Sequence, residues 1–183
     1  MQLVPQPRAP RARATAPPRR TRFLRRLPPH SLLGESAILK VTAFIDGGAR
    51  GNPGPAGYGV FMTKEDGEIL EISGFLGHTT NNVAEYSGLL EALATAQSEG
   101  ATIVEIISDS ELLVKQMLGQ YKVRHPNLIP LYERAKTMVR KFSRFSIRHT
   151  LRAGNKDADR LANKAIDRAA GRELERRRPN VAS

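Results

Sequence analysis

Four acidic residues stand where a carboxylate is poorly placed for solvation. Asp46 and Asp109 each close an apolar run of residues. Glu85 and Asp159 each lie in the first turns of a segment that carries an apolar stripe. A carboxylate beside apolar surface is costly unless something offsets its charge, and four in one pocket would raise one another's pKa. Bound divalent cations would resolve this conflict.

The composition limits which cation such a site could hold. The chain has no cysteine and only four histidines, so carboxylate oxygens are the main ligands available. Oxygen ligands fit Mg²⁺ or Mn²⁺ best. Two such ions can activate a water and stabilise the leaving oxygen of an in-line phosphodiester displacement. The four acids therefore indicate phosphodiester chemistry on a pair of metal ions.

Each acid also has a simpler structural interpretation when it is taken alone. Asp109 followed by Ser110 is a common helix N-cap pair. Asn81 or Asn82 followed by Glu85 fits a capping arrangement with an acid that the helix dipole favours. The other two acids suit a turn and a helix start. A fold without a metal site would require the structural interpretation to be correct for all four acids at once. We therefore favour the interpretation in which the four acids bind metal ions.

The elements that would position the acids follow from the spacing of apolar residues. Asp66-Gly67 is a strong hairpin signal, and Gly100 suits a helix C-cap. The first strand is expected to be buried on both faces and to end at Asp46. The element order predicts an α/β fold with a mixed sheet flanked by helices, not a doubly wound dinucleotide fold. We expect strands at 37–46, 56–64, 69–77, 102–108 and 144–151, and helices at 82–98, 110–118, within 125–142 and at 155–170.

Four motifs occur along the chain in a distinctive order: DGGARGNPGPAGYG, TTNNVAEY, SDSELLVKQ and NKDADRLAN. Together they resemble the type I ribonuclease H family over residues 38–170. The resemblance implies the ribonuclease H-like fold, a five-stranded mixed sheet with three antiparallel strands and two parallel additions. It also implies catalytic, metal-binding acids that hold two Mg²⁺ ions, with Mn²⁺ as a substitute. On this chain those acids are Asp46, Glu85, Asp109 and Asp159.

The function implied by the resemblance is hydrolysis of the RNA strand of RNA–DNA hybrids by an endonuclease. The products would carry 5′-phosphate and 3′-hydroxyl ends. The alternative is a non-catalytic module that binds hybrids or double-stranded RNA with the same fold. A proofreading-type exonuclease is disfavoured because Asp46 is followed by two glycines and not by the Asp-x-Glu pair of those enzymes. The residues implied to contact the substrate are Gly47, Gly48, Asn52, Asn81, Asn82 and Ser110.

Two residues compete for an auxiliary role beside the acids. Many family members carry a mobile histidine in the loop before the last acid, and His149 lies ten residues before Asp159. Strand alternation, however, places His149 on one face with Phe145 and Ile147, as part of the strand. Arg152, three residues later, is the alternative contact for the substrate. The sequence leaves both open.

Most of the net charge of +11 sits at the N-terminus. Residues 1–34 contain eight arginines and no acidic residue, which leaves 21 basic against 18 acidic residues, a net of +3, in the remainder. This segment is also rich in proline, which opposes regular structure. We therefore predict a disordered Arg/Pro-rich tail over 1–37, a catalytic domain over 38–170 and a basic C-terminal tail over 171–183.

Three interpretations of the N-terminal tail stay open. It suits a basic arm that adds affinity for nucleic acid, an organelle transit peptide, or a start codon placed too far upstream. The arm would matter because residues 117–130 lack the long basic, tryptophan-containing insertion that some family members use to grip DNA. We expect a cytoplasmic monomer, with organelle targeting open. No membrane partner is expected, since no apolar run approaches about 18 residues.

Overall fold

The structure, a computed structural model, describes residues 39–177. The predicted N-terminal tail at 1–37 and the last six residues of the C-terminal tail lie outside this range. The described residues form a sheet of five strands, with helices on both faces. In chain order the elements are β1 Lys40–Ala49, β2 Gly54–Lys64, β3 Ile69–Thr79, α1 Asn81–Ser98, β4 Ile103–Ser108, α2 Glu111–Met117, α3 Ile129–Val139, β5 Arg144–His149, the 3₁₀ turn η1 Arg152–Gly154 and α4 Lys156–Arg177.

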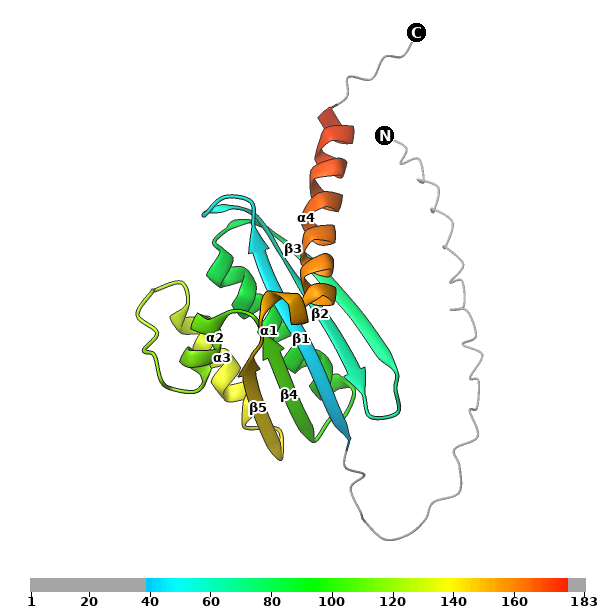
Figure 1. Cartoon of the computed structure of the whole chain (residues 1–183). Helices are drawn as coiled ribbons and strands as arrows, with labels where there is room; N and C mark the ends of the chain where they lie inside the picture. The colour runs from blue at the N-terminus through cyan, green and yellow to red at the C-terminus, as the bar shows by residue number, and fades with distance from the viewer. Residues whose placement is uncertain (1–38, 178–183) are drawn as a thin grey trace, which may run out of the picture. The chain divides into compact units, whose positions relative to one another are not determined.

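The sheet has the predicted mixed topology, in the order β3-β2-β1-β4-β5 (Figure 1). β1, β2 and β3 pair antiparallel along the chain. β4 then pairs parallel to β1, and β5 pairs parallel to β4. Parallel pairs need crossover connections, which the helices between these strands provide. The predicted fold class is therefore confirmed.

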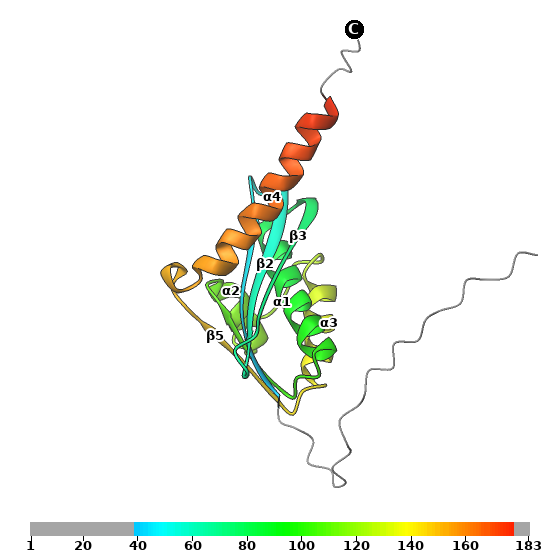
Figure 2. The ribbon, with the colours of Figure 1, turned by 90° about the vertical axis from the view of Figure 1, so that its right-hand side faces the viewer.

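Helices cover the two faces of the sheet unequally (Figure 2). The hydrophobic core lies on the α1 face, where Val41, Ala43 and Ile45 of β1 are buried in one cluster with Leu89 and Leu93 of α1. α4 crosses the opposite face over β2, where it also contacts β3 and β1, and its far half extends beyond the sheet. The uncovered part of that face leaves alternate residues of β1 only half-buried. The prediction that this strand is buried on both faces was therefore wrong.

Local turn and capping predictions are confirmed at the Asp66-Gly67 hairpin, at Gly100 and at Ser110, which caps α2. β2 and β3 form a hairpin in which Gly67 adopts a φ of 88°. After α1, Gly100 adopts a φ of 76° and its N–H donates to Gln97 O at 3.1 Å, as in a Schellman C-cap. The N-cap of α1 is Thr80, whose hydroxyl accepts from Val83 N. The asparagines that follow Thr80 do not cap this helix.

The last helix is longer than the spacing of its apolar residues predicts. α4 continues to Arg177, whereas the sequence indicated an end at 170. Among its residues 156–171, whose burial the structure describes, Ile166 is the last buried one. Between residues 39 and 177, no helix combines the length and the apolar character that crossing a membrane requires.

Candidate active site

Asp46 and Asp109 lie next to each other because two parallel strands stop pairing together. The β1–β4 ladder ends at the pair Ile45 and Ser108, and each acid is the next residue in its chain. The sequence predicted that β1 ends at Asp46, but the strand does not end there. It continues to Ala49, because β2 still pairs with it on the other side. Asp46 therefore stands on a strand fixed by hydrogen bonds, which is a firmer support than a loop.

Gly47 brings the third acid to this place. A Cβ atom at Gly47 would lie 2.1 Å from the backbone nitrogen of Glu85, far inside any allowed contact. The first turn of α1 can therefore pack against β1 only where β1 has no side chain. This approach places Glu85 beside Asp46. The family resemblance implied a substrate contact for Gly47, and the structure shows in addition that this glycine allows α1 to pack closely against β1.

Gly59 does the same for the fourth acid on the opposite face of the sheet. A Cβ atom at Gly59 would lie 2.2 Å from the carbonyl oxygen of Ala158 and 2.6 Å from the nitrogen of Ala162. The first turns of α4 thus rest directly on β2, at the residue that pairs with Asp46. Asp159, the neighbour of Ala158, is carried to the pocket by this contact.

All four acids line one pocket of about 290 Å³. Among the residues predicted to contact substrate, Gly47, Gly48, Asn81 and Ser110 also line it. Asn52 lies one hydrogen bond away, since its Oδ1 accepts from the backbone N–H of Asn81 at 3.3 Å. Asn82 is not a lining residue. The pocket is completed by Ala49, Arg50, Arg152, Ala162, Asn163 and Ile166.

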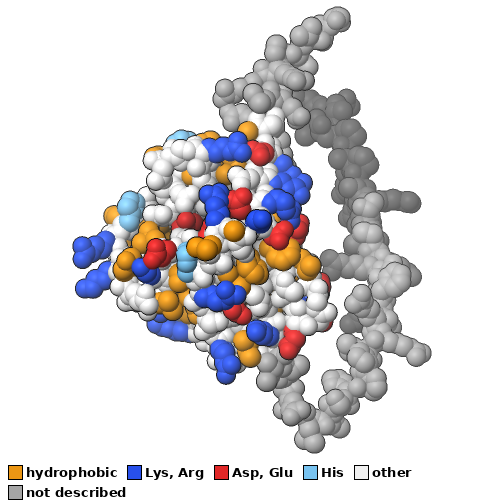
Figure 3. All heavy atoms as spheres, in the orientation of Figure 1, with side chains coloured by type: hydrophobic (Ala, Val, Ile, Leu, Met, Phe, Trp, Pro, Cys, Tyr) orange, Lys and Arg blue, Asp and Glu red, His pale blue; other side chains and the backbone are white. Residues whose placement is uncertain are grey.

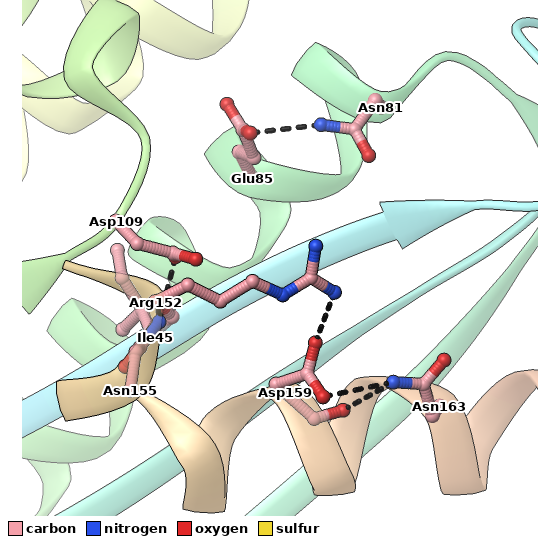
Figure 4. Close-up of polar contacts among 8 residues, drawn as sticks. All are labelled: Ile45, Asn81, Glu85, Asp109, Arg152, Asn155, Asp159 and Asn163. Atoms are coloured by element: carbon pink, nitrogen blue, oxygen red, sulfur yellow. Dashed lines mark hydrogen bonds and ion pairs between the residues drawn. The ribbon is translucent and has the colours of Figure 1, made fainter.

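Three of the four acids accept hydrogen bonds from neighbouring side chains (Figure 4). Glu85 accepts from Asn81 Nδ2 at 2.8 Å and from the hydroxyl of Ser110. Asp109 accepts from Asn155 Nδ2 at 2.7 Å. Asp159 accepts from Arg152 Nη2 at 2.6 Å and from Asn163 Nδ2 at 3.2 Å. These bonds hold the carboxylates in place at the pocket wall.

The pocket disfavours the ionised form of two acids. Burial raises the pKa of Asp46 from 3.8 to about 6, and the nearby charges of Asp109 and Asp159 add to this effect. Burial likewise raises the pKa of Glu85 from 4.5 to about 7, although its hydrogen bond from Ser110 works against the rise. A site that concentrates negative charge in this way favours a bound cation.

The donor set fits hard divalent cations. Four carboxylates from four elements supply only oxygen ligands, the type that Mg²⁺ and Mn²⁺ prefer. Within the described range, no three acidic or histidine side chains converge closely enough to form a ready ligand cluster. All four carboxylates nevertheless line the same pocket, and hydrogen bonds from protein donors hold Glu85, Asp109 and Asp159 at its wall.

Two arginines border the acids. Arg50 forms an ion pair with Asp167 of α4, and Arg152 is 78% exposed while it pairs with Asp159. Elsewhere on this face, Lys and Arg side chains are interspersed with Asp and Glu (Figure 3). Positive charge at the pocket is therefore local and does not form a broad basic surface on this side of the molecule.

His149 and Arg152 are clearly separated by the structure. His149 is the last residue of β5, as strand alternation predicted, and it is exposed and does not line the pocket. Arg152 lies in η1 and lines the pocket. Sequence reasoning missed Arg50, Asn155 and Asn163. Both asparagines belong to the motif NKDADRLAN, but nothing in that motif reveals which of its polar residues is buried.

Comparisons with known proteins agree with this geometry. The family model described as Reverse transcriptase-like matches residues 44–165. The bifunctional protein Rv2228c of Mycobacterium tuberculosis is 48% identical over 126 residues, which are 68% of this chain and 35% of that protein. Its N-terminal RNase H domain, solved as a fusion with maltose-binding protein, has a TM-score of 0.70 and 46% identity, covering 74% of this chain and 99% of the solved one.

Two further relatives carry the ribonuclease H name. Ribonuclease HI of Halobacterium salinarum is 41% identical over 124 residues, which are 67% of this chain and 62% of the relative. LC11-RNase H1, isolated from compost and solved in complex with an RNA/DNA hybrid, has a TM-score of 0.65 and 43% identity. The match covers 72% of this chain and 99% of that one. The chain spans less than two thirds of the length of the curated relatives described here.

The extent and identity of these matches decide the family. The family model covers well over half of the sequence, and two solved ribonuclease H chains are covered almost completely at more than 40% identity. The sheet order and the helices between the strands are those expected from the sequence motifs. This chain therefore belongs to the type I ribonuclease H family.

Proposed function

We propose that this protein is an endonuclease that hydrolyses the RNA strand of RNA–DNA hybrids, leaving 5′-phosphate and 3′-hydroxyl ends. The observation that carries the proposal is the convergence of four carboxylates, from β1, α1, α4 and the end of β4, on one pocket. A protein that only binds nucleic acid has no use for such a repulsive acidic cluster. The hybrid bound to LC11-RNase H1, at 43% identity, supports the choice of substrate.

We assign Asp46, Glu85, Asp109 and Asp159 to two divalent cations, Mg²⁺ in the first place and Mn²⁺ as a substitute. When bound, the cations would supply Lewis-acid activation of a water and of the scissile phosphate. The chain's own residues prepare for this by holding the acids. Asn81 and Ser110 hold Glu85 at the pocket wall, and burial keeps solvent from screening Asp46.

The substrate contacts implied by the family resemblance form part of the proposal. Recognition of 2′-hydroxyls in a minor groove needs close approach to the backbone and small polar groups. Gly48 offers such a bare stretch, because the nearest atom to a Cβ there would be Ile166 Cδ1 at 3.9 Å. Asn52 and Asn81 are already joined by a hydrogen bond beside the pocket, and Ser110 also lines it. Asn82 stays in the proposed set on the sequence motif alone.

The proposal is tested by cleavage of a labelled RNA–DNA hybrid with Mg²⁺, beside double-stranded RNA and DNA of the same sequence. The wild type should cut only the RNA strand of the hybrid. Asp46→Asn should lower the cleavage rate by at least about a thousandfold, because it removes a carboxylate at the centre of the pocket. End-labelling of the products with and without phosphatase treatment identifies the 5′-phosphate.

Binding of the hybrid without cleavage, in Mg²⁺ and in Mn²⁺, would instead favour a non-catalytic module. Equal cutting of double-stranded RNA would contradict the proposed selectivity. A cytoplasmic location and a monomeric state remain proposals from the sequence, which fluorescence microscopy and sedimentation of the full chain would test.

A further inference from the structure

Asn155 is a fully buried polar side chain beside the pocket. It lies between η1 and α4 and is 1% exposed. Its Nδ2 donates two hydrogen bonds, one to the backbone oxygen of Ile45 at 2.9 Å and one to Oδ1 of Asp109 at 2.7 Å (Figure 4). Both protons of the amide are thereby used, and both point toward the strands that carry the acids.

These contacts connect Asn155 to three of the four acids. Ile45 immediately precedes Asp46 on β1, so the first hydrogen bond fixes the backbone next to that acid. The second hydrogen bond holds the carboxylate of Asp109 directly. The backbone oxygen of Asn155 also accepts from the N–H of Asp159 at 3.1 Å. One residue thus ties β1, the end of β4 and the start of α4 together at the pocket.

Packing alone does not account for an asparagine at this position. Its Oδ1 is fully buried and has no hydrogen-bond partner among the residues that the structure describes. An unpaired buried acceptor destabilises the folded chain. An apolar side chain of similar size would fill the same volume without that cost. The two donated hydrogen bonds are therefore the feature that distinguishes asparagine from other residues here.

We propose that Asn155 is a positioning residue that fixes Asp109 relative to Asp46, so that the two carboxylates can share a divalent cation. The inference rests on the proposed function of the pocket. An amide suits the role because it donates to a carboxylate without changing the charge of the site. Asn155 does not reach substrate, and its effect passes through Asp109. Groups that orient metal ligands in this way typically contribute a factor of 10–100 in metal affinity or activity.

The sharpest test is Asn155→Asp, which keeps the shape of the side chain and removes both donors when ionised. The added negative charge by itself would strengthen binding of a cation. Positioning predicts the opposite, a fall of about 10–100-fold in Mn²⁺ affinity measured by titration calorimetry without hybrid. The Mg²⁺ concentration for half-maximal cleavage should rise by a similar factor. KM for the hybrid at saturating Mg²⁺ should stay unchanged.

Gln116→Glu is the matched control. Gln116 is another buried side-chain amide, 5% exposed, and its Oε1 accepts from the hydroxyl of Tyr86 at 2.8 Å. The same amide-to-acid change there touches none of the four acids. It should alter thermal stability while leaving the Mn²⁺ affinity within about twofold of the wild type. A general effect of a buried charge would instead change both variants alike.

Asn155→Ser, which keeps one short donor, is a second test in case the aspartate variant does not fold. It should fold by circular dichroism and show a fall in Mn²⁺ affinity. Unchanged or tighter Mn²⁺ binding in the folded variants would overturn the proposal, and so would unfolding of both, since Asn155 would then be a residue of the fold. If the wild type fails to cut hybrid while Asn155→Asp still weakens Mn²⁺ binding, the proposed function fails and the positioning role stands.

Discussion

Asp46 and Glu85 are the two carboxyl groups whose ionisation the folded chain opposes, with pKa values of about 6 and about 7. Both values lie above those of the unfolded chain, so protonation favours folding. This contribution is complete below about pH 4 and is lost as the pH rises through 6 and 7. In EDTA, the free energy of unfolding should therefore fall between about pH 4 and 7, by up to about 3 kcal/mol for each carboxyl. Urea denaturation at several pH values measures it.

Asp46→Asn isolates the contribution of one carboxyl. The variant should be more stable than the wild type at pH 8 in EDTA, because it removes a charge that burial and its neighbours disfavour. At pH 4.5 the difference should become small, since the wild-type carboxyl is then protonated. Added Mg²⁺ should stabilise the wild type more than the variant at pH 8. Parallel stability curves for the two proteins across this pH range would contradict the raised pKa.

At the level of elements, Gly47 and Gly59 determine how closely α1 and α4 approach the sheet. Gly47→Ala forces a Cβ atom against the backbone of Glu85, and a main-chain contact cannot be relieved by a rotamer change. We expect a loss of about 2–4 kcal/mol in stability, together with loss of cleavage as α1 moves away from β1. Thermal unfolding and the hybrid assay measure the two effects.

Gly48→Ala is the control for this prediction. The new methyl group would meet Ile166 Cδ1 only at 3.9 Å, an ordinary contact distance. Its melting temperature should therefore stay close to that of the wild type, whatever its effect on cleavage. Equal stability of the two alanine variants would show that α1 does not need the glycine to reach β1.

How far the sequence predicts these elements depends on the range of the interactions. The hairpin at Gly67 and the C-cap at Gly100 are set by neighbouring residues, and both were predicted. The extension of β1 beyond Asp46 was missed, because it depends on pairing with β2 and not on the low strand propensity of its glycines. The role of Asn155 was missed for the same reason, since its partners are 46 and 110 residues away.

The candidate acids could be predicted from two features of the sequence, their positions relative to the expected elements and the order of the motifs that contain them. Each lies at or near the start or end of an element, and the four motifs that contain them occur in family order. The residues proposed to contact substrate were less determined by sequence. Asn81 and Ser110 do line the pocket, whereas Asn82 is directed elsewhere by the turn of α1 that follows the Thr80 cap. A one-residue difference on a helix changes the direction of a side chain by about 100°.

At the scale of the whole molecule, positive charge is unevenly distributed. The chain outside residues 1–34 has a net charge of only +3, while that segment holds eight arginines. On the face shown in Figure 3 the charges of the described residues are mixed. We therefore expect the N-terminal arginines to supply a large part of the affinity for hybrid. Each arginine that neutralises a phosphate should add roughly 0.9 to the slope of log K against log salt.

Replacing the eight arginines by glutamine in the full chain tests this expectation without changing its length. Hybrid binding is measured by fluorescence anisotropy in an Asp46→Asn background, which prevents cleavage, between about 50 and 300 mM salt. The glutamine chain should bind more weakly and with a flatter salt dependence. Lysine in the same positions keeps the charge and should restore most of both, because counterion release depends on charge more than on the shape of the cation. Identical salt curves for the arginine and glutamine chains would assign hybrid affinity to the folded domain alone.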